Sequence, residues 1–367
     1  MSAAPLAPLD VAGRLPRLRE RLAAAGLPAL LVTKRENVRY LTGFTGSAGV
    51  LLVTADDALL VTDGRYATQA EEQLGTSGVP ARVGIGLTAA AQRELLAAAV
   101  RGHDRVGLEE HSVTWADQRE YAAALGAEVV PAGTPVEGLR RVKDAGELDR
   151  IRRACAIADD AFAAVVTRLA EGVTERQFAL ELEFAMRERG ASGTSFDPIV
   201  AAGPNGAMPH ARPTDRVIRR GELVVCDFGC VVDGYCSDMT RTVWVGDPGP
   251  EARRLFSVVL ESQAAGRDAV AADVECAAVD KASRDVIAAA GLADAFSHST
   301  GHGVGLEIHE APRVASSARD TLLAGDVVTV EPGVYVPGVG GVRIEDTVVV
   351  TATGAEPLTL APKELVL

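Results

Sequence analysis

The chain has 367 residues, of which 47% are hydrophobic and 24% charged, and its formal net charge is -13. This length suggests two domains, because a domain takes roughly 100–200 residues. The composition is that of a globular protein. The negative charge argues against a nucleic acid or an anionic membrane as a partner, since both reward a basic surface.

The amino terminus and the cysteines bear on the cellular compartment. The first ten residues, MSAAPLAPLD, lack the basic and apolar segments of a signal peptide, and no stretch reaches the roughly 20 apolar residues of a membrane span. Five cysteines are too few and odd in number for a disulfide framework. A cytoplasmic protein with reduced thiols is therefore expected.

Residues 1–135 predict an α/β domain. Residues 11–25 have the apolar spacing of an amphipathic helix, and three apolar runs after them predict short buried strands. The pattern continues with a helix near 88–101, a strand at 105–110 and a helix near 114–125. We find no group of acids, bases or metal ligands in this segment.

Residues 136–367 predict a second domain of the α+β class. Asp144 with Glu147, and Thr174 with Gln177, have the spacing of a capping box, so a helix is expected to begin at each pair. Further helices are expected at 250–271 and 276–290, and strands at 222–232, 235–245, 326–331 and 341–350.

The run GELVVCDFGCVVDGYCSDMTRTVWVG is the first candidate for chemistry. Asp233-Gly234 is a favoured dipeptide for a two-residue hairpin turn, and with it at the tip Asp227 pairs with Thr240. Asp227 and Asp238 then share a face, with Cα atoms roughly 7–8 Å apart. Two aspartates among apolar side chains are costly to bury unless a cation lies between them. The alternative is that one or both face water.

A second pair of acids lies in the run DVVTVEPGVYVPGVGGVRIEDTVVV. Glu331 ends one expected strand, and Glu345 lies in another, two residues from Arg343 and hence on the same face. A lone glutamate in a strand is usually solvated or ion-paired. Four acids in two hairpins favour a shared site.

Three of the six histidines lie within thirteen residues, in HSTGHGVGLEIHE. The spacing of His298, His302 and His309 matches neither the HExxH motif of zinc peptidases nor a Cys/His finger, so their partners must lie elsewhere. Glycines between them allow the backbone to approach a site closely.

Together these motifs resemble those of the creatinase and aminopeptidase family of pita-bread metallopeptidases, and within it the Xaa-Pro branch of prolidase and aminopeptidase P. The resemblance is detailed over about residues 140–367 and looser around NVRYLTGFTGSAG. It implies an α/β N-terminal creatinase-like domain over residues 1–135 and an α+β C-terminal pita-bread catalytic domain over residues 136–367.

The resemblance also implies a metal centre. Its five ligands fall in the motifs DFG, SDMTRT, GHGVG, EPG and RIED, on Asp227, Asp238, His302, Glu331 and Glu345. Two divalent ions would balance the four carboxylates at a separation of roughly 3.5–4 Å. Oxygen ligands with one imidazole suit manganese or cobalt, with zinc as the alternative.

Three cysteines stand near Asp227 in the sequence. In the expected hairpin register, Cys226 and Cys230 point away from the face of Asp227, while Cys236 points toward that face but lies nearer the turn. A zinc–thiolate site needs convergent sulfurs. We interpret all three as small buried hydrophobic residues.

By the same resemblance, His210, His298 and His309 surround the metal pair as substrate-binding and proton-handling residues. A metal-bridging water would attack the carbonyl carbon of the Xaa-Pro bond as a hydroxide, after Glu331 accepts its proton. His309 or His210 would stabilise the oxyanion.

Two arginines are candidates for holding a substrate carboxylate, namely Arg343 and Arg313. Either could instead pair with an acid such as Glu310 or Asp346.

The expected activity is hydrolysis of the Xaa-Pro bond at the N-terminus of dipeptides or short peptides. Dipeptidase and aminopeptidase both fit the chain length. A methionine-type aminopeptidase and a non-catalytic binding module of the same fold are further alternatives. Relatives are commonly homodimers whose N-terminal domain reaches toward the partner's active site, for which Tyr40, Phe44 and Arg65 are candidates.

Overall fold

The computed structural model describes residues 4–169 and 172–367, which form two compact units. One unit is Leu9–Arg140, and the other joins the residues up to Pro8 with Arg141–Leu367. Residues 1–3, which begin the segment where no signal peptide is expected, lie outside the described residues. None of the described helices is both long and apolar enough to cross a membrane.

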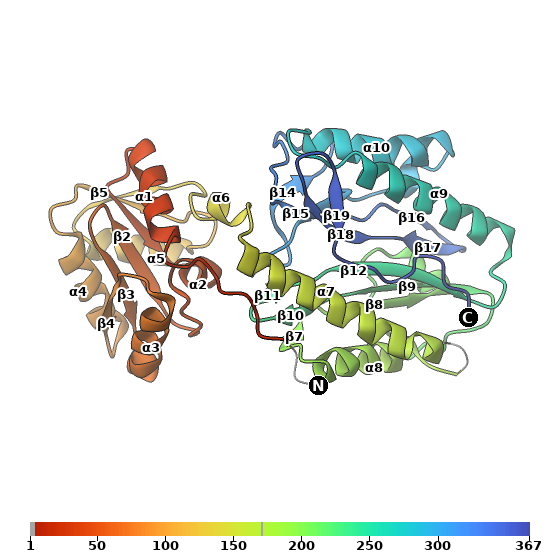
Figure 1. Cartoon of the computed structure of the whole chain (residues 1–367), viewed down its shortest axis with the longest axis horizontal. Helices are drawn as coiled ribbons and strands as arrows, with labels where there is room; N and C mark the ends of the chain where they lie inside the picture. The colour runs from red at the N-terminus through yellow and green to blue at the C-terminus, as the bar shows by residue number, and fades with distance from the viewer. Residues whose placement is uncertain (1–3, 170–171) are drawn as a thin grey trace. The chain divides into compact units, whose positions relative to one another are not determined.

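The unit Leu9–Arg140 is built on one mixed six-stranded sheet in the order β4-β3-β2-β1-β5-β6 (Figure 1). Its strands are β1 (Ala29–Val32), β2 (Val50–Thr54), β3 (Ala58–Thr62), β4 (Arg82–Ile85), β5 (Arg105–Leu108) and β6 (Glu128–Pro131). Its helices are α1 (Arg14–Ala24), α2 (Arg35–Thr42), α3 (Ala67–Ser77), α4 (Ala89–Val100), α5 (Trp115–Ala124) and the short α6 (Glu137–Arg140). Every residue of β1 and β3 is buried, as expected for strands covered on both faces.

The predicted helices α1, α4 and α5 and the predicted strands β1, β2, β3 and β5 are confirmed. The sequence prediction lacks β4 and β6, which are the two edge strands and begin with the charged residues Arg82 and Glu128. An edge strand shows a weaker apolar pattern because more of its surface meets solvent. Helix α6 belongs to this unit, since the Arg140 guanidinium donates to Asn37 at 2.8 Å.

Two of the three residues considered for contact with a partner's active site are buried in their own unit. Tyr40 is 3% and Phe44 2% exposed, and the Arg14 guanidinium lies 4.0 Å from the centre of the Tyr40 ring. They stabilise this fold instead, because a large aromatic side chain is most favourable in the core. Arg65 is accessible and forms an ion pair of 2.7 Å with Asp63.

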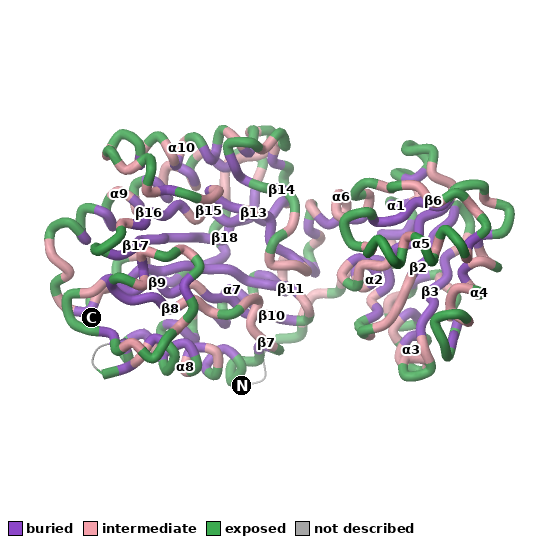
Figure 2. Tube along the Cα trace, turned by 180° about the vertical axis from the view of Figure 1, so that it is seen from behind, coloured by how far each residue is buried: buried purple, intermediate pink, exposed green. Residues whose placement is uncertain are grey.

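The second unit places its strands between two pairs of helices (Figure 1). One pair is α7 (Ala145–Val165) and α8 (Glu175–Glu188), and the other is α9 (Gly249–Asp268) and α10 (Cys276–Ala289). Its strands are β7 (Gly193–Thr194), β8 (Ile199–Ala202), β9 (Glu222–Phe228), β10 (Cys230–Val232), β11 (Tyr235–Cys236), β12 (Met239–Val245), β13 (Gly301–Gly303), β14 (Glu310–Val314), β15 (Val327–Val330), β16 (Gly333–Val336), β17 (Gly340–Arg343), β18 (Asp346–Val350) and β19 (Ala355–Pro357). The sheets are β11-β10-β7, β12-β9-β8, β14-β13-β15-β18-β19 and β16-β17. Figure 2 shows the buried residues concentrated along the central strands.

Both predicted capping boxes are confirmed. The Asp144 side chain accepts from the backbone N–H of Glu147 at the start of α7, and Thr174 accepts from Gln177 at the start of α8. Each box satisfies N–H groups that have no partner within the helix.

The predicted hairpin register is also confirmed. Asp233 and Gly234 have φ values of 43° and 79°, the left-handed conformation of a tight two-residue turn. Asp227 pairs with Thr240 as expected. The two long strands of the prediction are however interrupted, so that β9 and β10, and likewise β11 and β12, are separate. The interruption on the second side contains Asp238.

Cys226, Cys230 and Cys236 are core residues, as the sequence indicated. All five are buried thiols, and Cys226 and Cys230 belong to a cluster that also contains Phe162 and Phe228. Burial raises the pKa of Cys230 to about 11 and that of Cys236 to about 12, so both thiols stay protonated.

We expect a substitution at Gly229 to destabilise the fold. A Cβ atom there would overlap the backbone carbonyl of Ser237, which cannot move without separating the two strand pairs. Gly229→Ala should therefore lower the free energy of unfolding by about 1–3 kcal/mol. Gly354→Ala is the matched control, because nothing lies near the Cβ position of Gly354. Equal melting temperatures for the two variants would contradict this packing.

Candidate metal and catalytic centre

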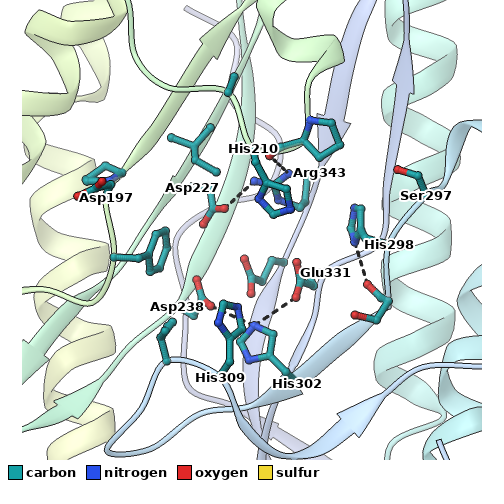
Figure 3. Close-up of a pocket in the computed structure, with 18 of the residues that line it drawn as sticks. Asp197, His210, Asp227, Asp238, Ser297, His298, His302, His309, Glu331 and Arg343 are labelled. Atoms are coloured by element: carbon teal, nitrogen blue, oxygen red, sulfur yellow. Dashed lines mark hydrogen bonds and ion pairs between the residues drawn. The ribbon is translucent and has the colours of Figure 1, made fainter. Parts of the chain in front are cut away.

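A cavity of about 870 Å³ in the second unit contains every residue that the sequence placed in the site. The side chains come from segments far apart in the chain and turn toward a common space (Figure 3). The lining includes the five expected metal ligands and the other expected site residues, His210, His298, His309, Arg313 and Arg343.

Three carboxylates form the centre of the cavity. Oxygens of Asp227, Asp238 and Glu345 all lie within 4.8 Å of one another. Asp227 lies in β9, which pairs with β12. Asp238 lies in the interruption just before β12. Glu345 lies in the break between β17 and β18, where its backbone N–H donates to the Thr240 carbonyl at 3.1 Å. The Thr240 hydroxyl donates to the Glu345 carboxylate at 2.7 Å.

His302 and Glu331 complete the group. The Nε2 atom of His302 lies 3.5 Å from Asp238 Oδ2 and 3.3 Å from Glu331 Oε1. Its Nδ1 atom lies 3.0 Å from the Gly303 carbonyl. A carbonyl only accepts hydrogen bonds, so Nδ1 carries the ring proton and Nε2 directs a lone pair at the carboxylates.

This arrangement fits a cation and little else. Burial lowers the pKa of His302 to about 4, which keeps the ring neutral. A neutral imidazole and two ionised carboxylates that face one another are the kind of donor set that binds a divalent cation. Asp227 Oδ1 and Glu345 Oε1 are buried and make no hydrogen bond to the described residues. Unsatisfied buried carboxylate oxygens are rare unless they bind an ion.

The pKa values of the acids agree with this reading. Burial, followed by the nearby charges of Glu345 and Asp227, raises the pKa of Asp238 well above its ordinary value. Burial and the charge of Glu331 likewise raise the pKa of Glu345. Burial raises the pKa of Glu331 to about 8, although Arg343 opposes that shift. Divalent ions would neutralise the group and remove this repulsion.

Arg343 is engaged within the protein. Its Nη2 lies 2.6 Å from Asp227 Oδ2, and its Nη1 donates to the Tyr335 hydroxyl at 2.6 Å. The acids suggested by the sequence have other cations, because Glu310 pairs with Lys143 at 2.7 Å and Asp346 with Arg241 at 3.0 Å. Arg343 thus fixes Asp227.

His298 has both ring nitrogens occupied. Its Nδ1 lies 2.8 Å from the Ser299 carbonyl, and its Nε2 lies 2.9 Å from the Tyr335 hydroxyl. Burial lowers its pKa to about 4, with Arg343 adding to the effect. In this geometry the ring holds Tyr335 and has no free nitrogen for a substrate.

The other two histidines are exposed at the cavity. The His309 ring stands edge-on to that of His302, with centroids 4.2 Å apart. The imidazole of His210 makes no hydrogen bond to the described part of the chain. Both rings are therefore available to a bound molecule.

Sequence reasoning missed the neutral residues that orient the charged ones. Thr240 contacts Glu345, the Thr329 hydroxyl donates to Glu331 at 3.2 Å, and Tyr335 links His298 to Arg343. Threonine and tyrosine are ordinary strand residues, so composition alone does not single them out. The two-residue spacing of Thr329 and Glu331 is the one signal that places both on one face.

The pKa of Glu331 predicts how the metal-free protein responds to pH. The folded state retains a proton near pH 8 that the unfolded chain, with an ordinary value of 4.5, has already released. The free energy of unfolding should therefore fall as pH rises from about 6.5 to 8. The lowered pKa of His302 acts oppositely only below its ordinary 6.5.

Thermal unfolding in the presence of a chelator measures this slope. Glu331→Gln is the control, since it removes one of the three carboxyl groups whose pKa is raised by burial and should make the slope shallower. A melting temperature that rises between pH 6.5 and 8 in the unsubstituted protein would contradict the account.

Comparison with known families covers most of the chain. Residues 149–352 match the metallopeptidase family M24, and residues 14–142 match the creatinase/prolidase N-terminal domain. The two matches follow the two compact units.

Individual relatives extend over nearly the whole chain. The uncharacterized peptidase YqhT of Bacillus subtilis (strain 168) is 42% identical over 357 residues, or 96% of this chain and 99% of that one. A solved Xaa-Pro dipeptidase from Bacillus anthracis superposes with a TM-score of 0.93 at 39% identity, covering 97% and 100% of the two chains. An X-Pro aminopeptidase from Thermotoga maritima MSB8 gives 0.87 at 35% identity, covering 96% and 99%. The chain therefore belongs to metallopeptidase family M24 and is a hydrolase with a creatinase-type N-terminal domain and a pita-bread catalytic domain.

Proposed function

We propose that the protein hydrolyses the Xaa-Pro bond at the N-terminus of dipeptides or short peptides with two divalent metal ions. The observation that carries this proposal is the convergence of four carboxylates and one neutral imidazole in a single cavity. The family implies divalent ions. Relatives named as Xaa-Pro dipeptidase and X-Pro aminopeptidase support the substrate class.

Two ions fit the donor set better than one. Asp227, Asp238 and Glu345 form one cluster of oxygens. The imidazole of His302 faces Asp238 and Glu331 on the other side. Asp238 is common to both groups, so the two groups together would hold two divalent ions. Manganese or cobalt stays the prediction for the metal, and a homodimer for the assembly.

When bound, such ions make a water molecule acidic enough to supply a nucleophile near neutral pH. The protein's own residues then hold the substrate and move protons. We assign proton acceptance to Glu331, whose carboxylate lies in the cavity beside the His302 imidazole. His309 and His210 donate hydrogen bonds to the substrate carbonyl. His298 acts indirectly, by holding Tyr335 against Arg343.

Arg313 is the better candidate for a substrate carboxylate. It pairs with His302 across β13 and β14, so its side chain lies on the same face as a proposed ligand. It is exposed at the cavity and forms no ion pair with the described residues. Arg343, by contrast, is already bound to Asp227. A guanidinium at this position favours dipeptides, in which the carboxylate follows proline directly.

Removing Asp238 should abolish both metal binding and turnover. Asp238→Ala takes away the carboxylate common to both donor groups, so purified protein dialysed against manganese should retain far less metal and release no proline from Ala-Pro. Metal content by mass spectrometry and proline release are the measurements. Asp197→Ala is the control, because Asp197 lines the cavity but is 87% exposed. Unchanged metal content in Asp238→Ala would refute the ligand assignment.

The Arg313 proposal is tested with two substrates. Arg313→Met should raise KM for Ala-Pro about tenfold or more, because a charged hydrogen bond is lost, with a much smaller effect on Ala-Pro-Ala. Arg212→Met is the matched control, since Arg212 lies at the same cavity and is 87% exposed. An equal effect of Arg313→Met on both peptides would show that Arg313 does not bind the terminal carboxylate.

A further inference from the structure

A buried acid outside the cavity is tied to the loop that carries His210. Glu175 is the first residue of α8 and is 0% exposed. Its place at the helix N-terminus is favourable for a negative charge. It does not line the cavity, and it is absent from the motifs that resemble the metallopeptidases.

The Glu175 carboxylate is fully used as an acceptor. Oε1 accepts from the Ala202 backbone N–H at 2.8 Å and from Asn205 Nδ2 at 3.0 Å. Oε2 accepts from Asn205 Nδ2 and the Thr214 backbone N–H, both at 3.0 Å, and from the Thr214 hydroxyl at 2.6 Å. The one carboxylate therefore binds Ala202, which lies just before residues 203–214, as well as Asn205 near the start of that segment and Thr214 at its end.

The joined segment contains His210. It begins with a short 3-10 helix (Gly203–Ala207) and continues past Pro209, whose carbonyl accepts from Arg343 at 3.2 Å. The His210 ring makes no hydrogen bond to the described residues. Its position is thus set by the backbone on either side of it, which Glu175 holds at two points.

We propose that Glu175 is a positioning residue that acts through His210. This inference rests on the proposed function, in which His210 donates to the substrate. A displaced donor lowers turnover although every metal ligand and every residue that touches substrate is still present.

Two variants test the proposal in the metal-loaded, full-length protein. Glu175→Gln keeps the shape but presents an amide N–H to a site lined by donors. Thr214→Val is milder, since among the bonds to Glu175 it removes only the 2.6 Å hydroxyl bond, together with weaker contacts of the hydroxyl with Asn205 and Arg216. Asp159→Asn is the matched control, because Asp159 also accepts two backbone bonds, from Leu360 at 2.8 Å and Ala361 at 2.9 Å, away from the cavity.

Amide hydrogen exchange measures the stability of residues 203–214 without an activity assay. Peptides covering 203–214 should exchange faster in Glu175→Gln, and less so in Thr214→Val, while Asp159→Asn leaves them unchanged. Unaltered exchange in both loop variants would overturn the anchoring role. Because this arm needs no substrate, it separates failure of the proposal from failure of Xaa-Pro hydrolysis, which would be seen as a lack of turnover in the unsubstituted protein.

Values of kcat/KM for Ala-Pro then test whether Glu175 affects turnover through His210. Glu175→Gln and His210→Ala should each lower kcat/KM about tenfold or more at full metal content. The double variant should be at most roughly threefold below His210→Ala, because the anchor has nothing left to position. The proposal would be overturned if the loss of kcat/KM in the double variant equalled the product of the two single losses. It would also be overturned if Glu175→Gln lost metal or kept wild-type turnover.

Discussion

The catalytic unit depends on the cost of confining four carboxylates in one buried cavity. Burial and mutual repulsion raise the pKa values of Asp238, Glu331 and Glu345, so the group is unfavourable as free anions. Hydrogen bonds from the protein relieve only part of this, since one oxygen each of Asp227 and Glu345 has no donor among the described residues. A positive charge is the missing component, and the neutral imidazole of His302 is placed to bind it.

Two of these carboxylates lie at breaks between strands. Asp238 lies in the gap between β11 and β12, and Glu345 lies in the gap between β17 and β18. At each gap the backbone leaves the ladder, so the side chain is no longer restricted to the alternation of a regular strand. Gly229 makes one of these breaks possible because the Ser237 carbonyl occupies the space of a side chain. Regular strands on either side keep the gaps in register.

Much of the fold and of the site can be predicted from the sequence, for identifiable physical reasons. The turn dipeptide Asp233-Gly234 determines the pairing of β9 with β12, and so places Asp227 opposite Thr240. Motif types and order indicate the family, because four acids and one imidazole in that order are a specific pattern. The spacing also predicted that Cys226 and Cys230 point away from the face of Asp227, and both lie in the core.

What the sequence could not supply is the partnership of polar groups across distant segments. Arg343 pairs with Asp227 rather than with Glu310 or Asp346, which depends on how β17 packs against β9. The same holds for His298, whose nitrogens are taken by Ser299 and Tyr335. These pairings depend on the positions of side chains in the folded protein, so the spacing of residues in the sequence does not predict them.

Anomalous diffraction from crystals soaked in manganese tests the central claim most directly. The account predicts two peaks about 3.5–4 Å apart, enclosed by Asp227, Asp238, His302, Glu331 and Glu345. A cavity without any anomalous peak, or ions held by other residues, would contradict it.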